Sequence, residues 1–143
     1  FQVIHLAGAR EYYFLKNSYK DSNINFRLFS FLEPMQYAYS ASDLVISRAG
    51  ATTITEIIFF ELAAIIIPYP FAYRHQIANA KVLENIGSGI IIQDNDLDSG
   101  ILKKNIANLV NNPDRIKAMR SHYDNIQRRN ANNLLAEEVL SLN

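Results

Sequence analysis

The chain has 143 residues, 49% of them hydrophobic and 20% charged, which fits one globular domain with a core. The 14 Lys and Arg residues balance 14 Asp and Glu residues, which argues against a general nucleic-acid binder, because such proteins carry a basic excess. Cysteine is absent, so disulfides, thiolate metal ligands and a cysteine nucleophile are excluded.

Apolar runs and turn residues predict strands that alternate with helices. Strands are expected at 2–7, 25–31, 43–47, 64–68 and 89–93. Helices are expected at 10–19, 34–41, 53–62, 74–86, 97–111 and 113–129, with a last one from 131. Pro34 is predicted to be the first residue of its helix. Alternating strands and helices indicate parallel βαβ units, and therefore one open, doubly wound α/β sheet followed by extra C-terminal helices.

The segments that follow the strands are the places to look for a ligand. In doubly wound sheets, ligands bind beyond the carboxyl ends of the strands. Gly8, Leu32, Gly50 and the segment 71–76 all lie at such ends. The strand at 2–7 is expected to be buried, and no apolar run reaches the length of about 20 residues that spans a bilayer.

The stretch SRAGATTITE, residues 47–56, allows two interpretations. Thr53 and Glu56 have the spacing of a capping box, in which both side chains bind backbone N–H groups at the helix start. Alternatively, the helix N-terminus binds phosphate, Gly50 lets the backbone approach a ligand, and Glu56 accepts hydrogen bonds from a ribose. For Arg48 we favour a structural role, pairing with Glu61 or Asp43, over a phosphate contact.

A second polar group opens the helix at 74–86. His75 is a candidate general base, ligand donor or helix cap, although a lone histidine is seldom catalytic. The amide of Gln76 has both a donor and an acceptor for sugar hydroxyls, and Asn79 lies about one turn further on.

The other polar residues are interpreted as structural or solvent-exposed. Asp94, Asp96 and Asp98 lack the glycine and distal glutamate of a calcium loop and indicate a turn and a helix start. His5 and His122 are treated as structural. The basic excess between residues 103 and 129 is interpreted as a solvated helix face, with an acidic partner or an anionic membrane as the alternative.

The segments SDLVISRAGATTITEI and IIIPYPFAYRHQIANAKVLENIGSGIII resemble the donor-binding half of the MurG family, bacterial transferases that add N-acetylglucosamine to lipid I to form lipid II. The family pattern is Arg-Ser-Gly-Ala with a Glu six residues after the Gly, then a strand ending in proline and a His-Gln or Gln-Gln pair. Here Ala49 replaces the serine, while Gly50, Glu56, Pro68 and Gln76 fit the pattern. The resemblance covers essentially the whole chain.

The resemblance implies a set of ligand contacts. Glu56 would bind the ribose hydroxyls of UDP, His75 and Gln76 would lie by the N-acetylglucosamine, and the backbone near Leu32 would contact uracil. The remaining candidates around the donor are Arg48, Gly50, Ala51, Thr52 and Asn79. No metal or other cofactor is indicated, and a divalent cation would act through the diphosphate or another domain.

The resemblance also implies that 1–143 is one donor domain of a two-domain GT-B enzyme. The acceptor domain, with the membrane-facing surface and the general base, would be another domain or a partner chain, as in eukaryotic split transferases. The first strand of the donor domain, with its pyrophosphate loop, is also expected to be missing. The full-length protein would then lie in the cytoplasm, peripherally on the inner membrane. The alternatives are another UDP-sugar transferase and a non-catalytic nucleotide-sugar-binding module.

Overall fold

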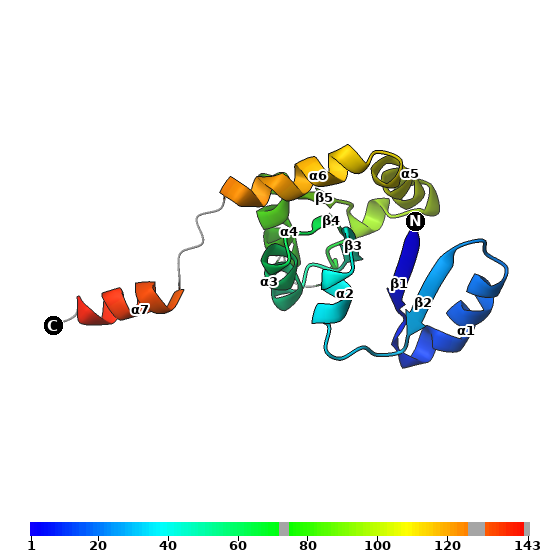
Figure 1. The fold of residues 1–143 in the computed structure, drawn as a ribbon, viewed down its shortest axis with the longest axis horizontal. Helices are drawn as coiled ribbons and strands as arrows, with labels where there is room; N and C mark the ends of the chain where they lie inside the picture. The colour runs from blue at the N-terminus through cyan, green and yellow to red at the C-terminus, as the bar shows by residue number, and fades with distance from the viewer. Residues whose placement is uncertain (72–74, 126–130, 142–143) are drawn as a thin grey trace.

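A computed structural model of the chain describes residues 1–71, 75–125 and 131–141. Strands and helices alternate along it (Figure 1). The strands are β1 (Gln2–Leu6), β2 (Asn25–Phe29), β3 (Leu44–Ser47), β4 (Ala63–Ile66) and β5 (Gly89–Ile91). The α-helices are α1 (Gly8–Lys20), α2 (Gln36–Ser40), α3 (Ala51–Phe59), α4 (His75–Asn85), α5 (Ser99–Val110), α6 (Pro113–Ser121) and α7 (Ala131–Leu140). Two short 3₁₀ segments are η1 (Asp94–Asp96) and η2 (His122–Asn125).

All the strand pairs in the described residues are parallel, which confirms the predicted α/β class. The strands form two sheets, β1–β2 and β3–β4–β5, rather than one hydrogen-bonded sheet. In the larger sheet Val45 lies opposite Ala64, and Ile65 lies opposite Ile90. In the smaller one Ile4 lies opposite Arg27. The prediction of a single sheet was therefore too simple, because no hydrogen bonds join β1 or β2 to β3.

The core lies on both faces of β4. Every residue of β4 is buried, and alternate side chains belong to two different clusters. Ala64 and Ile66 pack with α3 and α4 residues such as Ile57 and Leu83. The opposite cluster joins β4 to α5 and α6 and contains Ala63, Ile65, Leu109 and Met119. Helices thus cover both faces of this sheet, as a doubly wound fold requires.

Several predictions about single elements were wrong. Residues 33 and 34 form a bend, so α2 begins at Gln36 instead of at Pro34. The strand β1 is half exposed rather than buried, because among the described strands it pairs with β2 alone. Helix α3 ends at Phe59, three residues before its predicted end, and α6 ends at Ser121, where η2 follows it, whereas the helix was predicted to run to 129. The other differences are one or two residues at element ends. The predicted helix start at Arg74 and the predicted helical residues 126–129 lie outside the described residues.

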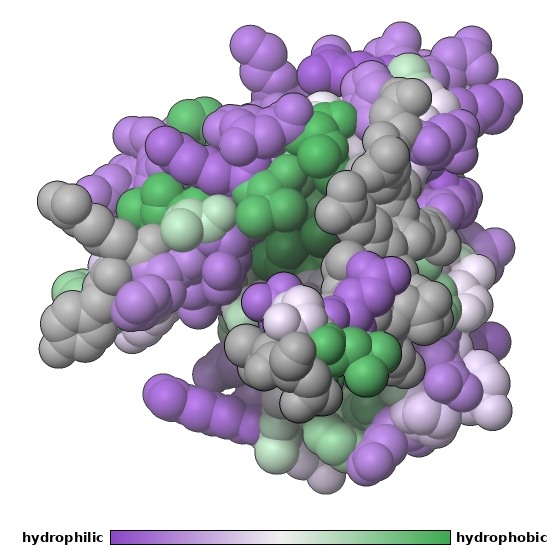
Figure 2. Space-filling view, turned by 90° about the vertical axis from the view of Figure 1, so that its left-hand side faces the viewer, coloured by the Kyte–Doolittle hydropathy of each residue, from purple (hydrophilic) through white to green (hydrophobic). Residues whose placement is uncertain are grey.

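Apolar side chains also reach the surface. They come up between polar ones on the face that Figure 2 shows, which is the side of the molecule where α7 lies in Figure 1. Phe59 at the end of α3 is 70% exposed, and Leu135 on α7 is 67% exposed. In the described part of the chain, no helix is long and apolar enough to cross a membrane.

Candidate functional site

The turn from β3 to α3 lies at the carboxyl end of β3, where ligands bind in such sheets. Gly50 is extended, with φ −62° and ψ 143°, and it is the N-cap of α3. The helix therefore begins at Ala51, two residues earlier than predicted. Thr53 is the third helical residue and not an N-cap, so the capping-box interpretation was wrong.

Glu56 lies in the second turn of α3, and its carboxylate contacts α2. The hydroxyl of Tyr39 donates a hydrogen bond to Oε2 of Glu56 at 3.0 Å. Tyr39 is 7% exposed and its ring stacks on Phe60, with the centroids 5.4 Å apart. Burial, the hydrogen bond to Glu56 and the negative charge of Glu56 raise the pKa of Tyr39 to about 12. The phenol is therefore the donor across the whole neutral range, and Glu56 is the acceptor.

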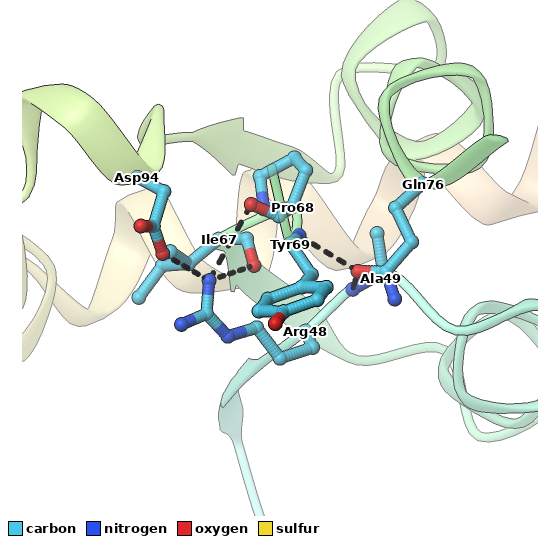
Figure 3. Close-up of polar contacts among 7 residues, drawn as sticks. All are labelled: Arg48, Ala49, Ile67, Pro68, Tyr69, Gln76 and Asp94. Carbon is cyan, nitrogen blue, oxygen red and sulfur yellow. Dashed lines mark hydrogen bonds and ion pairs between the residues drawn. The ribbon is translucent and has the colours of Figure 1, made fainter. Parts of the chain in front are cut away.

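Gln76 and Asn79 hold the β3–α3 turn from the side of α4. Oε1 of Gln76 accepts hydrogen bonds from the backbone N–H of Ala49 at 3.1 Å and of Tyr69 at 2.8 Å (Figure 3). Nδ2 of Asn79 donates to the carbonyl of Ala49 at 3.0 Å. Ala49 is fully buried, so both of its backbone groups are satisfied by side chains of α4. One oxygen of Gln76 thus joins the segments that follow β3 and β4.

Arg48 joins the ends of three neighbouring strands. Its guanidinium donates to the carbonyls of Ile67 and Pro68, at 3.3 and 3.4 Å, and forms an ion pair with Asp94 after β5 (Figure 3). It also lies 5.6 Å from the ring centroid of Tyr69. The favoured structural role is supported, but neither predicted partner is the one seen. Asp43 pairs instead with Arg120, at 3.3 Å.

The other predicted site residues lie around this turn or beyond it. Ala51 and Thr52 are exposed in the first turn of α3, and His75 is exposed at the start of α4 beside Gln76. Leu32 is half-buried between β2 and α2. Hydrogen bonds from Gln76 and Asn79 hold Ala49, and the neighbouring Arg48 bonds to the segments after β4 and β5. Among the described contacts, Leu32 and His75 take no part in this network.

Exposed residues surround the candidate site, among them Ala51, Thr52 and His75. Two surface hollows lie elsewhere, one of about 410 Å³ between α1 and β2, the other of about 650 Å³ beside β5 and α5. Glu56 and Gln76 line neither of these two hollows. Within the described ranges, no three His, Asp or Glu side chains gather as metal ligands.

The sequence analysis missed Tyr39 and the partner of Arg48. Tyr39 is 17 residues from Glu56, and nothing in its spacing marks it. Asp94 could have been found, because the carboxyl ends of parallel neighbouring strands meet at one edge and β3, β4 and β5 are neighbours. Arg48 follows β3 and Asp94 follows β5, so their meeting across the end of β4 agrees with the strand order.

Known proteins are similar to this chain in both sequence and fold. The family model "Glycosyltransferase family 28 C-terminal domain" matches residues 1–137. The chain belongs to glycosyltransferase family 28. Its resemblance to the donor-binding half of a GT-B transferase is thereby confirmed at the level of family and fold.

Relatives within family 28 carry one recurrent name, UDP-N-acetylglucosamine--N-acetylmuramyl-(pentapeptide) pyrophosphoryl-undecaprenol N-acetylglucosamine transferase. The one from Thermodesulfovibrio yellowstonii is 40% identical over 119 residues, which are 82% of this chain and 32% of the relative. The one from Rickettsia bellii is 44% identical over 100 residues, which are 69% of this chain and 28% of the relative. The chain thus spans about a third of the length of these relatives.

A solved structure gives the same result for the fold. The chain is similar to MurG of Acinetobacter baumannii with a TM-score of 0.87 and 30% sequence identity. The match covers 99% of this chain and 41% of that protein. The predicted α/β architecture of a GT-B donor domain is therefore correct.

Proposed function

We propose that this chain is the UDP-N-acetylglucosamine-binding part of an inverting glycosyltransferase that converts lipid I to lipid II. Family 28 membership and the name shared by the relatives support the reaction class. In this reaction the hydroxyl of the acceptor attacks the anomeric carbon of N-acetylglucosamine, the bond from that carbon to the diphosphate breaks, and UDP leaves.

The observation that carries the proposal is the N-terminus of α3. Gly50 has no side chain to cap it, and within the described residues the N–H groups of Ala51, Thr52 and Thr53 donate to no acceptor. Free N–H groups and the positive end of the helix dipole suit an anion. The diphosphate of a nucleotide sugar is such an anion, and its negative charge grows as UDP leaves.

Gly50 supports the same assignment because the fold itself does not need a glycine there. Its φ is −62°, a value open to all residues. A Cβ added at this position would lie 3.5 Å from Oγ1 of Thr53, an ordinary contact. A side chain there would instead stand at the helix N-terminus, where the diphosphate is proposed to approach. Space for a ligand is thus a reason for a glycine that the internal packing does not provide.

The remaining contacts follow the family resemblance. Glu56 accepts hydrogen bonds from the ribose hydroxyls, and the backbone at Leu32 contacts uracil. Because Oε1 of Gln76 is engaged with two backbone groups, its Nε2 is the atom left to donate to a sugar hydroxyl, next to His75. Arg48 braces the turn through Asp94 rather than binding the ligand.

We further propose that the chain binds the donor but does not turn it over alone. The acceptor site and the general base would belong to an acceptor domain or partner chain that brings the lipid-linked acceptor at the cytoplasmic face of the inner membrane. Any divalent cation would act through the diphosphate. No sugar transfer is expected when 1–143 is mixed with donor and lipid acceptor.

Calorimetric titration of the chain with UDP-N-acetylglucosamine, UDP-glucose and ADP tests the proposal. We expect the uridine nucleotides to bind and ADP not to bind. Glu56→Ala should weaken UDP-N-acetylglucosamine binding by about 1–3 kcal/mol, the scale of a lost hydrogen bond to a charged group. Glu84→Ala, which removes an exposed carboxylate from α4, is the matched control and should change nothing.

Other results would contradict the proposal. Equal binding of ADP and UDP would show that the site does not distinguish uracil from adenine. If Glu56→Ala lowered stability but left the affinity unchanged, Glu56 would be only the acceptor of the Tyr39 hydroxyl. A preference for UDP-glucose over UDP-N-acetylglucosamine would replace the proposed donor by another UDP-sugar.

Gly50→Ala separates binding from folding at the same turn. Its Cβ has room against the protein, so the free energy of unfolding should change by less than about 1 kcal/mol. The affinity for UDP should fall several-fold, because the methyl group meets the diphosphate. Thermal unfolding and titration of one sample give both quantities. A variant that binds UDP normally would place the diphosphate elsewhere.

A further inference from the structure

At Glu56, α2 and α3 are joined by a hydrogen bond to a carboxylate as well as by apolar packing. Tyr39 is almost completely buried, and its hydroxyl donates to one oxygen of the Glu56 carboxylate, Oε2, at 3.0 Å. Glu56 itself is half-buried. Its second oxygen, Oε1, receives no hydrogen bond from any described residue. The carboxylate is therefore held at one oxygen and open at the other.

The stacking of Tyr39 fixes the direction of that hydrogen bond. The ring lies against Phe60 at an interplanar angle of 23°, so the hydroxyl has a defined position relative to α3. An isolated glutamate on a helix surface has several accessible rotamers, and ordering it costs free energy on binding. A hydrogen bond from a fixed donor removes part of that cost before any ligand arrives.

We propose that Tyr39 is a positioning residue that presents the Glu56 carboxylate to the ribose diol of the nucleotide. The inference rests on the proposed function, in which Glu56 binds the ribose. A carboxylate oxygen has two lone pairs, so Oε2 can accept from Tyr39 while Oε1, and the remaining lone pair of Oε2, accept from the two ribose hydroxyls. Tyr39 then contributes to affinity without touching the nucleotide.

The simpler alternative is that Glu56 only satisfies a buried hydroxyl and joins α2 to α3. Both accounts predict that Tyr39→Phe lowers stability, so stability alone does not separate them. The two accounts differ in how much the ribose hydroxyls contribute to the loss of affinity. A positioning role makes the loss of affinity depend on the ribose hydroxyls, whereas a purely structural role weakens all uridine nucleotides alike.

Tyr123 provides a matched control. It is 2% exposed, and its hydroxyl donates to the carbonyl of Leu62 at 2.9 Å. Tyr123→Phe therefore removes the hydroxyl of a buried tyrosine in the same core, together with its bond to Leu62, and Tyr123 does not contact Glu56. The effect of a lost phenol on general stability is thereby separated from its effect on the carboxylate.

The experiment measures the dissociation constants of UDP and of dideoxy-UDP, which lacks both ribose hydroxyls, for the unsubstituted chain and both variants. We expect Tyr39→Phe to raise the dissociation constant of UDP by about 3- to 10-fold, the range of one net hydrogen bond. The constant for dideoxy-UDP should change by less than about 2-fold. Tyr123→Phe should leave both constants unchanged.

Two results would overturn the inference, and they are distinguishable. If UDP binds through Glu56 but Tyr39→Phe weakens UDP and dideoxy-UDP equally, or weakens neither, Tyr39 is not a positioning residue and the proposed function stands. If UDP does not bind the unsubstituted chain, or binds without any contribution from Glu56, the proposed role of Glu56 fails and the inference fails with it.

Discussion

The β1–β2 unit, which includes α1, and the β3–β5 sheet with its helices differ sharply in burial. No residue from 1 to 34, which includes all of α1, is buried. In the other unit all four residues of β4 are buried, and both core clusters gather on its two faces. The two units have the same kind of strands and helices, so the difference lies in how many neighbours each strand has.

The position of each strand explains the difference. The strand β4 lies between β3 and β5 and is covered by helices on both faces. The strand β1 is hydrogen-bonded to β2, and its apolar residues Ile4 and Leu6 are 38% and 40% exposed. A site that must hold several side chains in fixed positions is better supported by the first arrangement. Arg48, Gln76 and Glu56 all lie there.

Truncating one isoleucine in each unit gives the largest test of this comparison. Ile65 in β4 is fully buried, whereas Ile4 in β1 is 38% exposed. Ile65→Ala should lower the free energy of unfolding by about 3–4 kcal/mol, since it removes buried methyl groups and leaves a cavity. Ile4→Ala should cost about 1 kcal/mol or less. Urea unfolding measures both, and equal losses would contradict the comparison.

The two hydrogen bonds that Oε1 of Gln76 accepts, from Ala49 and Tyr69, give a test with an intermediate expected effect on stability. Gln76→Leu leaves the N–H groups of Ala49 and Tyr69 without their acceptor, which should cost about 1–3 kcal/mol of stability. Gln93→Leu, an exposed glutamine after β5, is the matched control and should stay within about 0.5 kcal/mol. Gln76→Glu keeps an oxygen acceptor and should fold better than Gln76→Leu. If all three unfold alike, these two hydrogen bonds do not stabilise the site.

The smallest effect concerns tyrosines at high pH. The pKa of Tyr39 is raised from 10.0 to about 12, and burial also raises the pKa of Tyr19 in the β1–β2 unit, by less. The unfolded chain loses these protons first, so the stabilisation is complete below pH 10 and falls as the pH rises from about 10 to 12. Tyr39→Phe should remove a loss on the order of 1 kcal/mol from this range, and Tyr19→Phe a smaller one. Unfolding titrations between pH 8 and about 12 measure both slopes. If the free energy of unfolding of Tyr39→Phe fell more steeply with pH than that of the unsubstituted chain, the prediction would be wrong.

Local sequence patterns predicted most of the helices and strands, because the formation of each one depends on residues that are close together in the chain. The isoleucine runs at 65–67 and 90–92 mark β4 and β5, and Asp98 caps α5 by accepting from the N–H of Ile101. The family pattern located the β3–α3 turn. The candidate site could therefore be assigned to the carboxyl end of β3 without coordinates.

Contacts between distant segments were beyond the sequence. The Tyr39–Glu56 bond joins two helices, and no spacing in the sequence marks it. The Arg48–Asp94 pair, 46 positions apart, follows only once the strand order β3–β4–β5 is known. The spacing of Thr53 and Glu56 fits a capping box, but the extended backbone of Gly50 starts the helix earlier and turns Glu56 toward α2. The division into two sheets depends on which strand edges meet, and no property of a single strand reveals that.

Hydrogen exchange of the chain, with and without saturating UDP-N-acetylglucosamine, tests the central claim most directly. The claim is that the donor binds at the β3–α3 turn. We predict slower amide exchange in residues 48–56 and around Asn79 when the ligand is present, with no change in α1. Protection of α1 with unchanged exchange in residues 48–56 would contradict the account and place the ligand on the other unit.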